Sequence, residues 1–272
     1  MLSFVLLLSA LSAQSLTAVR PLVSQSEDGP AIEAGQSFQP GELIFFSFQI
    51  ENYKTSSAGK IELTGHAEAF DPAGKPIATK DEIAIGATVS DEDKSWKPKL
   101  RSQIQIPTLV PAGKYKIKFD VTDLQSKQTS TGETTFTVHS RTVEPSQSLA
   151  IRNFAFYRSQ DDDTAIQNAS YKPGDMLWVR FDITGYKYGD QNSIDVAYDV
   201  AVFRANGQSL FSQEDAAVEK SQAFYPQPWV PAEFNLTLQS TMSEGSYTLV
   251  ITAHDAGGRQ TTKSQAEFRV SR

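Results

Sequence analysis

Three consecutive carboxylates, Asp161, Asp162 and Asp163, form the densest cluster of metal-binding side chains in this sequence. Carboxylate oxygens are ligands for Ca²⁺, so the triplet is a candidate calcium site. Calcium-binding loops alternate their acidic residues with other residues, however, and three in a row lack that spacing. A solvated surface loop is the favoured interpretation, and the triplet stays a weak calcium candidate.

A group of aromatic residues could bind a ligand. Tyr225 follows Phe224 in a stretch that also contains Pro226 and Pro228, and Trp229 comes directly after it, while Tyr188 lies upstream. Rings exposed on loops stack on sugars or anchor protein partners. We predict a ligand-binding site that consists of Tyr188, Phe224, Tyr225 and Trp229. The alternative is that these rings close the core of their own domain or pack on another one.

The sequence offers little for catalysis. Its three histidines, His66, His139 and His254, are far apart and lack the spacing of a zinc site. Because there is no Cys, there is no thiolate metal site, disulfide or Cys nucleophile. No Gly-X-Ser-X-Gly elbow, phosphate loop or dinucleotide fingerprint occurs. We therefore predict that the protein is not an enzyme and uses no cofactor.

Composition limits the possible partners. The formal net charge of −7 over 272 residues argues against binding to nucleic acid or to an anionic membrane. With 39% hydrophobic residues and 16 Phe, the chain has enough apolar material for folded cores. No stretch after the first residues approaches the roughly 20 apolar residues of a membrane-spanning helix. The sequence predicts no membrane span in the mature chain.

The N-terminal 13 residues are almost entirely apolar or small, which is typical of a secretory signal peptide. No Lys or Arg precedes the apolar run, although a basic segment is usual there. An N-terminal core strand is the alternative. We predict a signal peptide over residues 1–15 and a secreted or periplasmic location.

An internal repeat organises the rest of the chain. The segment 40–42, Pro-Gly-Glu, returns as Pro-Gly-Asp at 173–175, and Trp96-X-Pro returns as Trp229-X-Pro. Gly113-Lys-Tyr returns as Gly245-Ser-Tyr. Two copies of one domain are therefore predicted, at 16–138 and 149–272, joined by the polar linker 139–148. A residue present in both copies is a candidate for a structural role, and a residue present in one is a candidate for function.

Alternating apolar and polar residues indicate strands in both copies. The clearest run covers residues 115–121, where Tyr, Ile, Phe and Val alternate with Lys and Asp. Strict alternation places one face in a core and the other in water. Short strands separated by Gly and Asn turns predict an all-β fold, with a pair of packed antiparallel sheets in each copy.

The segment 109–115, Leu-Val-Pro-Ala-Gly-Lys-Tyr, resembles the tyrosine corner of immunoglobulin-like and fibronectin type III sandwiches, and Glu-Gly-Ser-Tyr at 244–247 repeats it. The resemblance implies two tandem immunoglobulin-like β-sandwiches of about seven strands each, in which the Tyr hydroxyl bonds to upstream backbone. It is similar to the repeats of bacterial secreted proteins. The resemblance implies a fold and no activity.

These observations predict a secreted, non-catalytic binding or structural module of the cell envelope or exterior. Its partner would be a protein, recognised through loops or a sheet edge. The alternative is a carbohydrate-binding accessory module that uses exposed aromatic residues of the second domain. Protein and polysaccharide are thus the two expected partners, and nucleic acid is not expected.

Overall fold

The computed structural model describes residues 15–33, 35–93 and 95–271. Residue packing divides the chain into two compact units. Unit 1 runs to His139, without residues 107–112, and unit 2 comprises those residues and the chain from Ser140 onward. The predicted signal peptide lies outside the described residues except for Ser15. The described residues include no helix that is long and apolar enough to cross a membrane.

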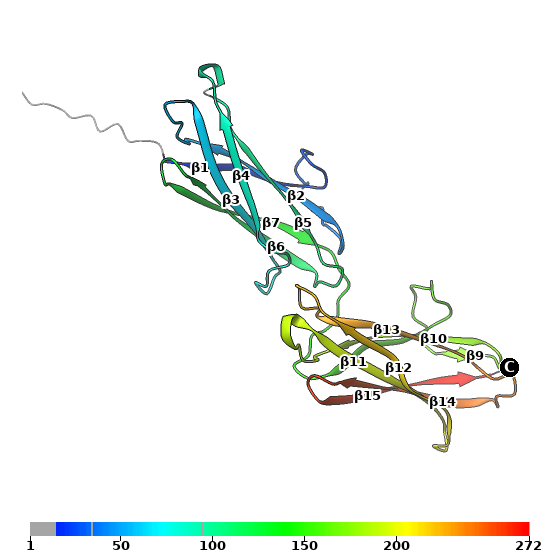
Figure 1. Ribbon diagram of the computed structural model, residues 1–272. Coiled ribbons are helices and arrows are strands. Elements are labelled where there is room, and N and C mark those ends of the chain that lie inside the picture. Colours follow the sequence, from blue (N-terminus) through cyan, green and yellow to red (C-terminus); the bar gives the residue numbers. More distant parts are fainter. Residues whose placement is uncertain (1–14, 34, 94, 272) are drawn as a thin grey trace, which may run out of the picture. The chain divides into compact units, whose positions relative to one another are not determined.

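Unit 1 consists of two antiparallel sheets (Figure 1). The three-stranded sheet has the order β1-β2-β5, and the four-stranded sheet has the order β4-β3-β6-β7. The strands are β1 (Thr17–Ser24), β2 (Leu43–Glu51), β3 (Lys60–Phe70), β4 (Asp81–Thr88), β5 (Lys99–Gln105), β6 (Gly113–Asp123) and β7 (Thr129–Val138).

Unit 2 has the same order of pairing with one addition. Its sheets are β13-β10-β8 and β12-β11-β14-β15-β9, where the short β9 pairs in parallel with β15. The strands are β8 (Ala150–Tyr157), β9 (Ser170–Tyr171), β10 (Met176–Thr184), β11 (Ile194–Arg204), β12 (Ser209–Ser221), β13 (Trp229–Thr237), β14 (Gly245–Asp255) and β15 (Gln260–Val270).

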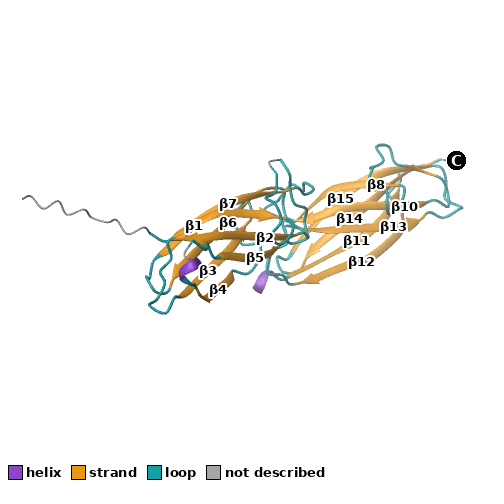
Figure 2. Ribbon diagram, turned by 90° about the horizontal axis from the view of Figure 1, so that it is seen from above, coloured by secondary structure: helices purple, strands orange, loops and turns teal. Residues whose placement is uncertain are grey.

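Strands account for nearly all the regular structure of the described residues, which confirms the all-β prediction. Figure 2 shows the two exceptions, the short 3₁₀ turns η1 (Asp91–Asp93) and η2 (Asp190–Asn192). Both turns lie in loops between strands, so neither covers a sheet.

The predicted alternation decides which face of each strand is buried. In β6, Tyr115, Ile117 and Val121 are fully buried, while the lysines between them point outward. Phe119 of β6 packs against Phe46 of β2, with ring centroids 5.2 Å apart, so the core of unit 1 joins both sheets. Each such buried side chain stabilises the fold by about 1.5–3 kcal/mol.

Three short polar motifs fix the ends of strands. Tyr247 donates its hydroxyl to the Ser243 carbonyl at 2.6 Å, which is the bond implied by the tyrosine corner. Asp123 is buried and accepts four hydrogen bonds, including the Gln125 N–H two residues on. Although burial raises its pKa, these bonds outweigh burial and hold the pKa below its ordinary value. Asp255 accepts similar bonds in unit 2.

Candidate functional site

The four aromatic residues predicted to bind a ligand lie at the end of unit 2 where β10 ends and β13 begins. The structure separates them into two pairs. Tyr225 and Trp229 are buried, with exposed fractions of 5% and 3%, whereas Tyr188 and Phe224 are 39% and 53% exposed. A buried ring has no free face for a ligand, so the predicted site can use only Phe224 and Tyr188 as contact surfaces.

Hydrogen bonds hold the loop that carries Phe224. The hydroxyls of Tyr186 and Tyr188 both donate to the Gln227 carbonyl, at 2.6 and 2.5 Å. Asn192 donates from its side-chain amide to the Phe224 carbonyl at 2.7 Å. Burial raises the pKa of both tyrosines, so both hydroxyls remain protonated donors at neutral pH. The exposed Phe224 ring therefore stands on a backbone that is fixed on both sides.

Trp229 is covered by the predicted linker. Arg141 lies over its ring, with the guanidinium carbon 5.4 Å from the centroid. The same guanidinium donates two hydrogen bonds to the fully buried Asp182, at 2.8 and 2.5 Å. Asn153 donates a third at 2.8 Å, from a left-handed backbone position (φ 53°) at a bulge in β8. Arg141 thus fastens the start of the linker to unit 2.

The equivalent region of unit 1 is open. Trp96 is 41% exposed and lines a groove of about 570 Å³, which we call the Trp96 groove. Tyr53 donates its hydroxyl to the Trp96 carbonyl at 2.7 Å, and Lys97 pairs with Glu51 at the rim. The remaining walls include the hydroxyl side chains of Thr55, Ser56, Ser57, Ser90 and Ser95.

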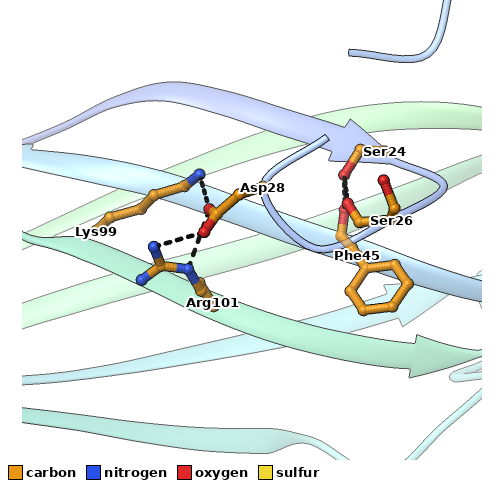
Figure 3. Close-up of polar contacts among 6 residues, drawn as sticks. All are labelled: Ser24, Ser26, Asp28, Phe45, Lys99 and Arg101. Carbon is orange, nitrogen blue, oxygen red and sulfur yellow. Dashed lines mark hydrogen bonds and ion pairs between the residues drawn. The ribbon is translucent and has the colours of Figure 1, made fainter. Parts of the chain in front are cut away.

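A second groove of unit 1, also of about 570 Å³, runs beside the edge strand β5. Figure 3 shows Asp28 at its border, between Lys99 and Arg101. Arg101 bonds both carboxylate oxygens, at 3.2 and 3.0 Å, and Lys99 bonds one at 2.5 Å. These bonds lower the pKa of Asp28 to about 2. The carboxylate holds both cations and closes the loop after β1, where Ser24 also bonds the Ser26 and Phe45 carbonyls.

The acidic triplet lies in the loop after β8. Asp162 accepts the Thr164 N–H at 2.9 Å, and its carbonyl accepts a bond from Arg180 at 2.9 Å. In the part of the chain that the structure describes, no three or more His, Asp or Glu side chains are grouped so as to hold a metal ion. Calcium binding by Asp161–Asp163 stays a prediction, which thermal melts with millimolar Ca²⁺ and with chelator test.

Two histidines pair with carboxylates on outward faces of the sheets. His66 contacts Asp120 at 2.9 Å in unit 1, and His254 contacts Asp199 at 2.7 Å in unit 2. The second His also approaches the Thr261 hydroxyl at 3.3 Å, which gives a Thr-His-Asp series. Because β14 is paired on both sides, its N–H groups serve the sheet and offer no oxyanion hole there.

Sequence reasoning missed two features of this region. One is the role of Arg141, which depends on a contact between the linker and Asp182 and leaves no local pattern. The other is the openness of the Trp96 groove. Its signal was present, because Thr55 stands where the second copy has Tyr188, so a large side chain is missing from unit 1.

No protein-family model matches the sequence, and no curated protein matches it. Among solved structures, the C-terminal domain of the antigen I/II polypeptide BspA of Streptococcus agalactiae is 10% identical, with 93% of this chain and 99% of that chain covered and a TM-score of 0.32. The C-terminal domain of the Streptococcus pyogenes antigen I/II-family protein AspA is 11% identical, with the same coverage and TM-score.

A third structure is the Pseudomonas fluorescens alkylpurine DNA glycosylase AlkC bound to DNA containing an abasic site analogue. It is 10% identical, with a TM-score of 0.31, and the match covers 46% of this chain and 31% of that chain. The matched region thus spans less than a third of the glycosylase. TM-scores this low show neither the fold nor the function of this chain.

Proposed function

We propose that this chain is a non-catalytic binding module of two immunoglobulin-like sandwiches, acting at the cell envelope or exterior. The supports for the fold are the equal order of pairing in both units and the tyrosine-corner bond of Tyr247. The apolar segment at residues 1–15 supports the location.

The partner that we propose for unit 2 is a protein, contacted through loop 222–228. The observation that carries this proposal is the 53% exposed Phe224 ring on a loop fixed by Tyr186, Tyr188 and Asn192. An aromatic anchor that is already positioned loses little conformational entropy on binding, which is how aromatic residues come to dominate protein interfaces. Loops at the end of a rigid sandwich are a common place for such anchors.

A pull-down from the envelope fraction of the source organism tests this function. The bait is residues 16–272, and the matched baits carry Phe224→Ala or, as a control for an exposed apolar residue elsewhere in unit 2, Leu210→Ala. We expect a protein that is retained by the wild type and by Leu210→Ala and lost with Phe224→Ala. Equal retention by all three baits would contradict the role of loop 222–228, and no specific retention would contradict protein binding.

A further inference from the structure

The Trp96 groove of unit 1 is a site that unit 2 fills with its own side chains. Tyr188 of unit 2 reaches the Gln227 carbonyl at 2.5 Å, and Asn192 bridges to the Ala223 and Phe224 carbonyls. The repeat places Thr55 and Gly59 at these two positions of unit 1. Neither side chain is long enough to make the same bridges. Unit 1 therefore lacks two side chains that occupy this region in unit 2.

Gly59 and Asn192 share one backbone conformation and differ in their side chains. Gly59 has φ +72° and Asn192 has φ 57°, both in the left-handed region, where Gly and Asn are favoured. A Cβ at Gly59 would lie 2.7 Å from the Val89 carbonyl oxygen, which is main chain and cannot move aside cheaply. Gly at this position lets the backbone lie close to the Val89 carbonyl and leaves no side chain in the groove.

The electrostatics of the groove favour an uncharged ligand. In unit 2 the tryptophan of the repeated motif, Trp229, is covered by the cation of Arg141, which is held there by the Asp182 carboxylate. The repeat places the neutral Gln49 at the position of Asp182, so unit 1 lacks the carboxylate that holds a cation. The charges at the rim, Lys97 and Glu51, neutralise each other. The two charged side chains that line the groove therefore sum to zero.

The shape and chemistry of the walls favour a sugar ring. The face of an indole ring carries partial negative charge, and it attracts the partially positive C–H groups on the flat face of a pyranose. Trp96 is 41% exposed and lines the groove, so part of the residue is accessible to a ligand. The hydroxyls of Thr55, Ser57 and Ser95 line the groove and can exchange hydrogen bonds with sugar hydroxyls. Ser90 already donates to Asp93, and Ser56 accepts two backbone N–H groups. A volume of about 570 Å³ lies within the usual range of about 300–1,000 Å³ for ligand sites.

We propose that the Trp96 groove binds a neutral hexopyranose polysaccharide, with Trp96 as the stacking platform. This site is separate from loop 222–228 and has a different class of ligand, so either can fail without the other. It moves the expected carbohydrate contact from the aromatic residues of the second domain to the first domain. The reason is that Trp229 and Tyr225 are buried, whereas Trp96 is not.

Affinity gel electrophoresis of residues 16–272 tests the proposal, with soluble starch, mixed-linkage β-glucan, galactomannan and hydroxyethylcellulose in separate gels. We expect at least one of them to retard the protein. Trp96→Ala should weaken that binding by about tenfold or more, equivalent to about 1.4 kcal/mol. Trp96→Phe, which retains a flat ring, should restore part of the loss. Leu210→Ala, which removes an exposed apolar side chain of unit 2, should be retarded like the wild type.

A second variant fills the groove instead of removing its platform. Thr55→Tyr introduces the residue type of Tyr188 and should abolish retardation while Trp96 remains in place. A melt unchanged from the wild type shows that the variant is folded. Retardation by none of the four polysaccharides would overturn the proposal, as would equal retardation of the wild type and Trp96→Ala. Retardation by heparin or polygalacturonate alone would overturn the neutral class of ligand.

Discussion

Trp96 and Trp229 belong to the same Trp-X-Pro motif in the two copies and have opposite environments. The two motifs are one residue out of step in the sheets, because Pro231 pairs with Asp182 in unit 2, whereas Lys99 and not Pro98 pairs with the equivalent Gln49 in unit 1. Trp229 is 3% exposed beneath Arg141, and Trp96 is 41% exposed beside a groove. The strands of the two units pair in the same order, but Trp229 is the first residue of β13 and Trp96 lies in the loop before β5. The difference arises from this one-residue shift together with a few side chains, because Tyr188, Asn192 and Arg141 fill the region in unit 2. In unit 2 these side chains close the region, and in unit 1 the same region is the open Trp96 groove.

The largest loss of stability is expected in unit 2, where a buried carboxylate depends on Arg141. Arg141→Ala leaves the fully buried Asp182 carboxylate with Asn153 as its remaining side-chain partner. Breaking a buried pair costs about 3–5 kcal/mol, and we expect about 3 kcal/mol because Arg141 is itself half-exposed. Calorimetry should show the transition of unit 2 at a lower temperature.

The matched control for this prediction is Arg101→Ala in unit 1, which breaks the exposed contacts with Asp28. Exposed ion pairs contribute about 0–1 kcal/mol, so this change should be small. If Arg141→Ala cost no more than Arg101→Ala, the linker would not be fastened to unit 2 in the way described.

A smaller effect is expected from the tyrosines that hold the loops. Tyr186→Phe removes a donor from the Gln227 carbonyl, and Tyr53→Phe removes the equivalent donor from the Trp96 carbonyl. A lost hydrogen bond costs about 1 kcal/mol on average. Tyr186 is buried and Tyr53 is partly exposed, so water can replace the second donor more easily. Denaturant unfolding should show a larger loss for Tyr186→Phe, and the reverse order would contradict the comparison.

The smallest effect concerns pH and unit 1. The Arg101 and Lys99 contacts lower the pKa of Asp28 from 3.8 to about 2. Because the pKa in the folded state is below that in the unfolded state, the contribution to stability is complete above about pH 4 and is lost as the pH falls toward 2. NMR titration of the Asp28 carboxyl should give a midpoint near 2. A midpoint near 3.8 would show that the contacts with Lys99 and Arg101 do not persist in solution.

Local patterns in the sequence were sufficient to predict much of the fold. The alternation in residues 115–121 identified the buried face of β6, and the Gly turn signals marked where strands end, as at Gly74 and Gly207. These features depend on neighbours in the chain. The environment of Trp229 depends instead on Arg141 and Asp182, which are distant from it in sequence. A repeated Trp-X-Pro motif therefore suggested equal roles for two residues whose surroundings differ.

Hydroxyl-radical footprinting of the wild-type protein, resolved by peptide mass spectrometry, tests the central difference most directly. It compares two tryptophans within one molecule and needs no variant. The exposed indole of Trp96 should be oxidised several-fold faster than the covered indole of Trp229 under native conditions, and the two rates should become similar in denaturant. Equal native rates, or faster oxidation of Trp229, would contradict the account of one open and one closed copy.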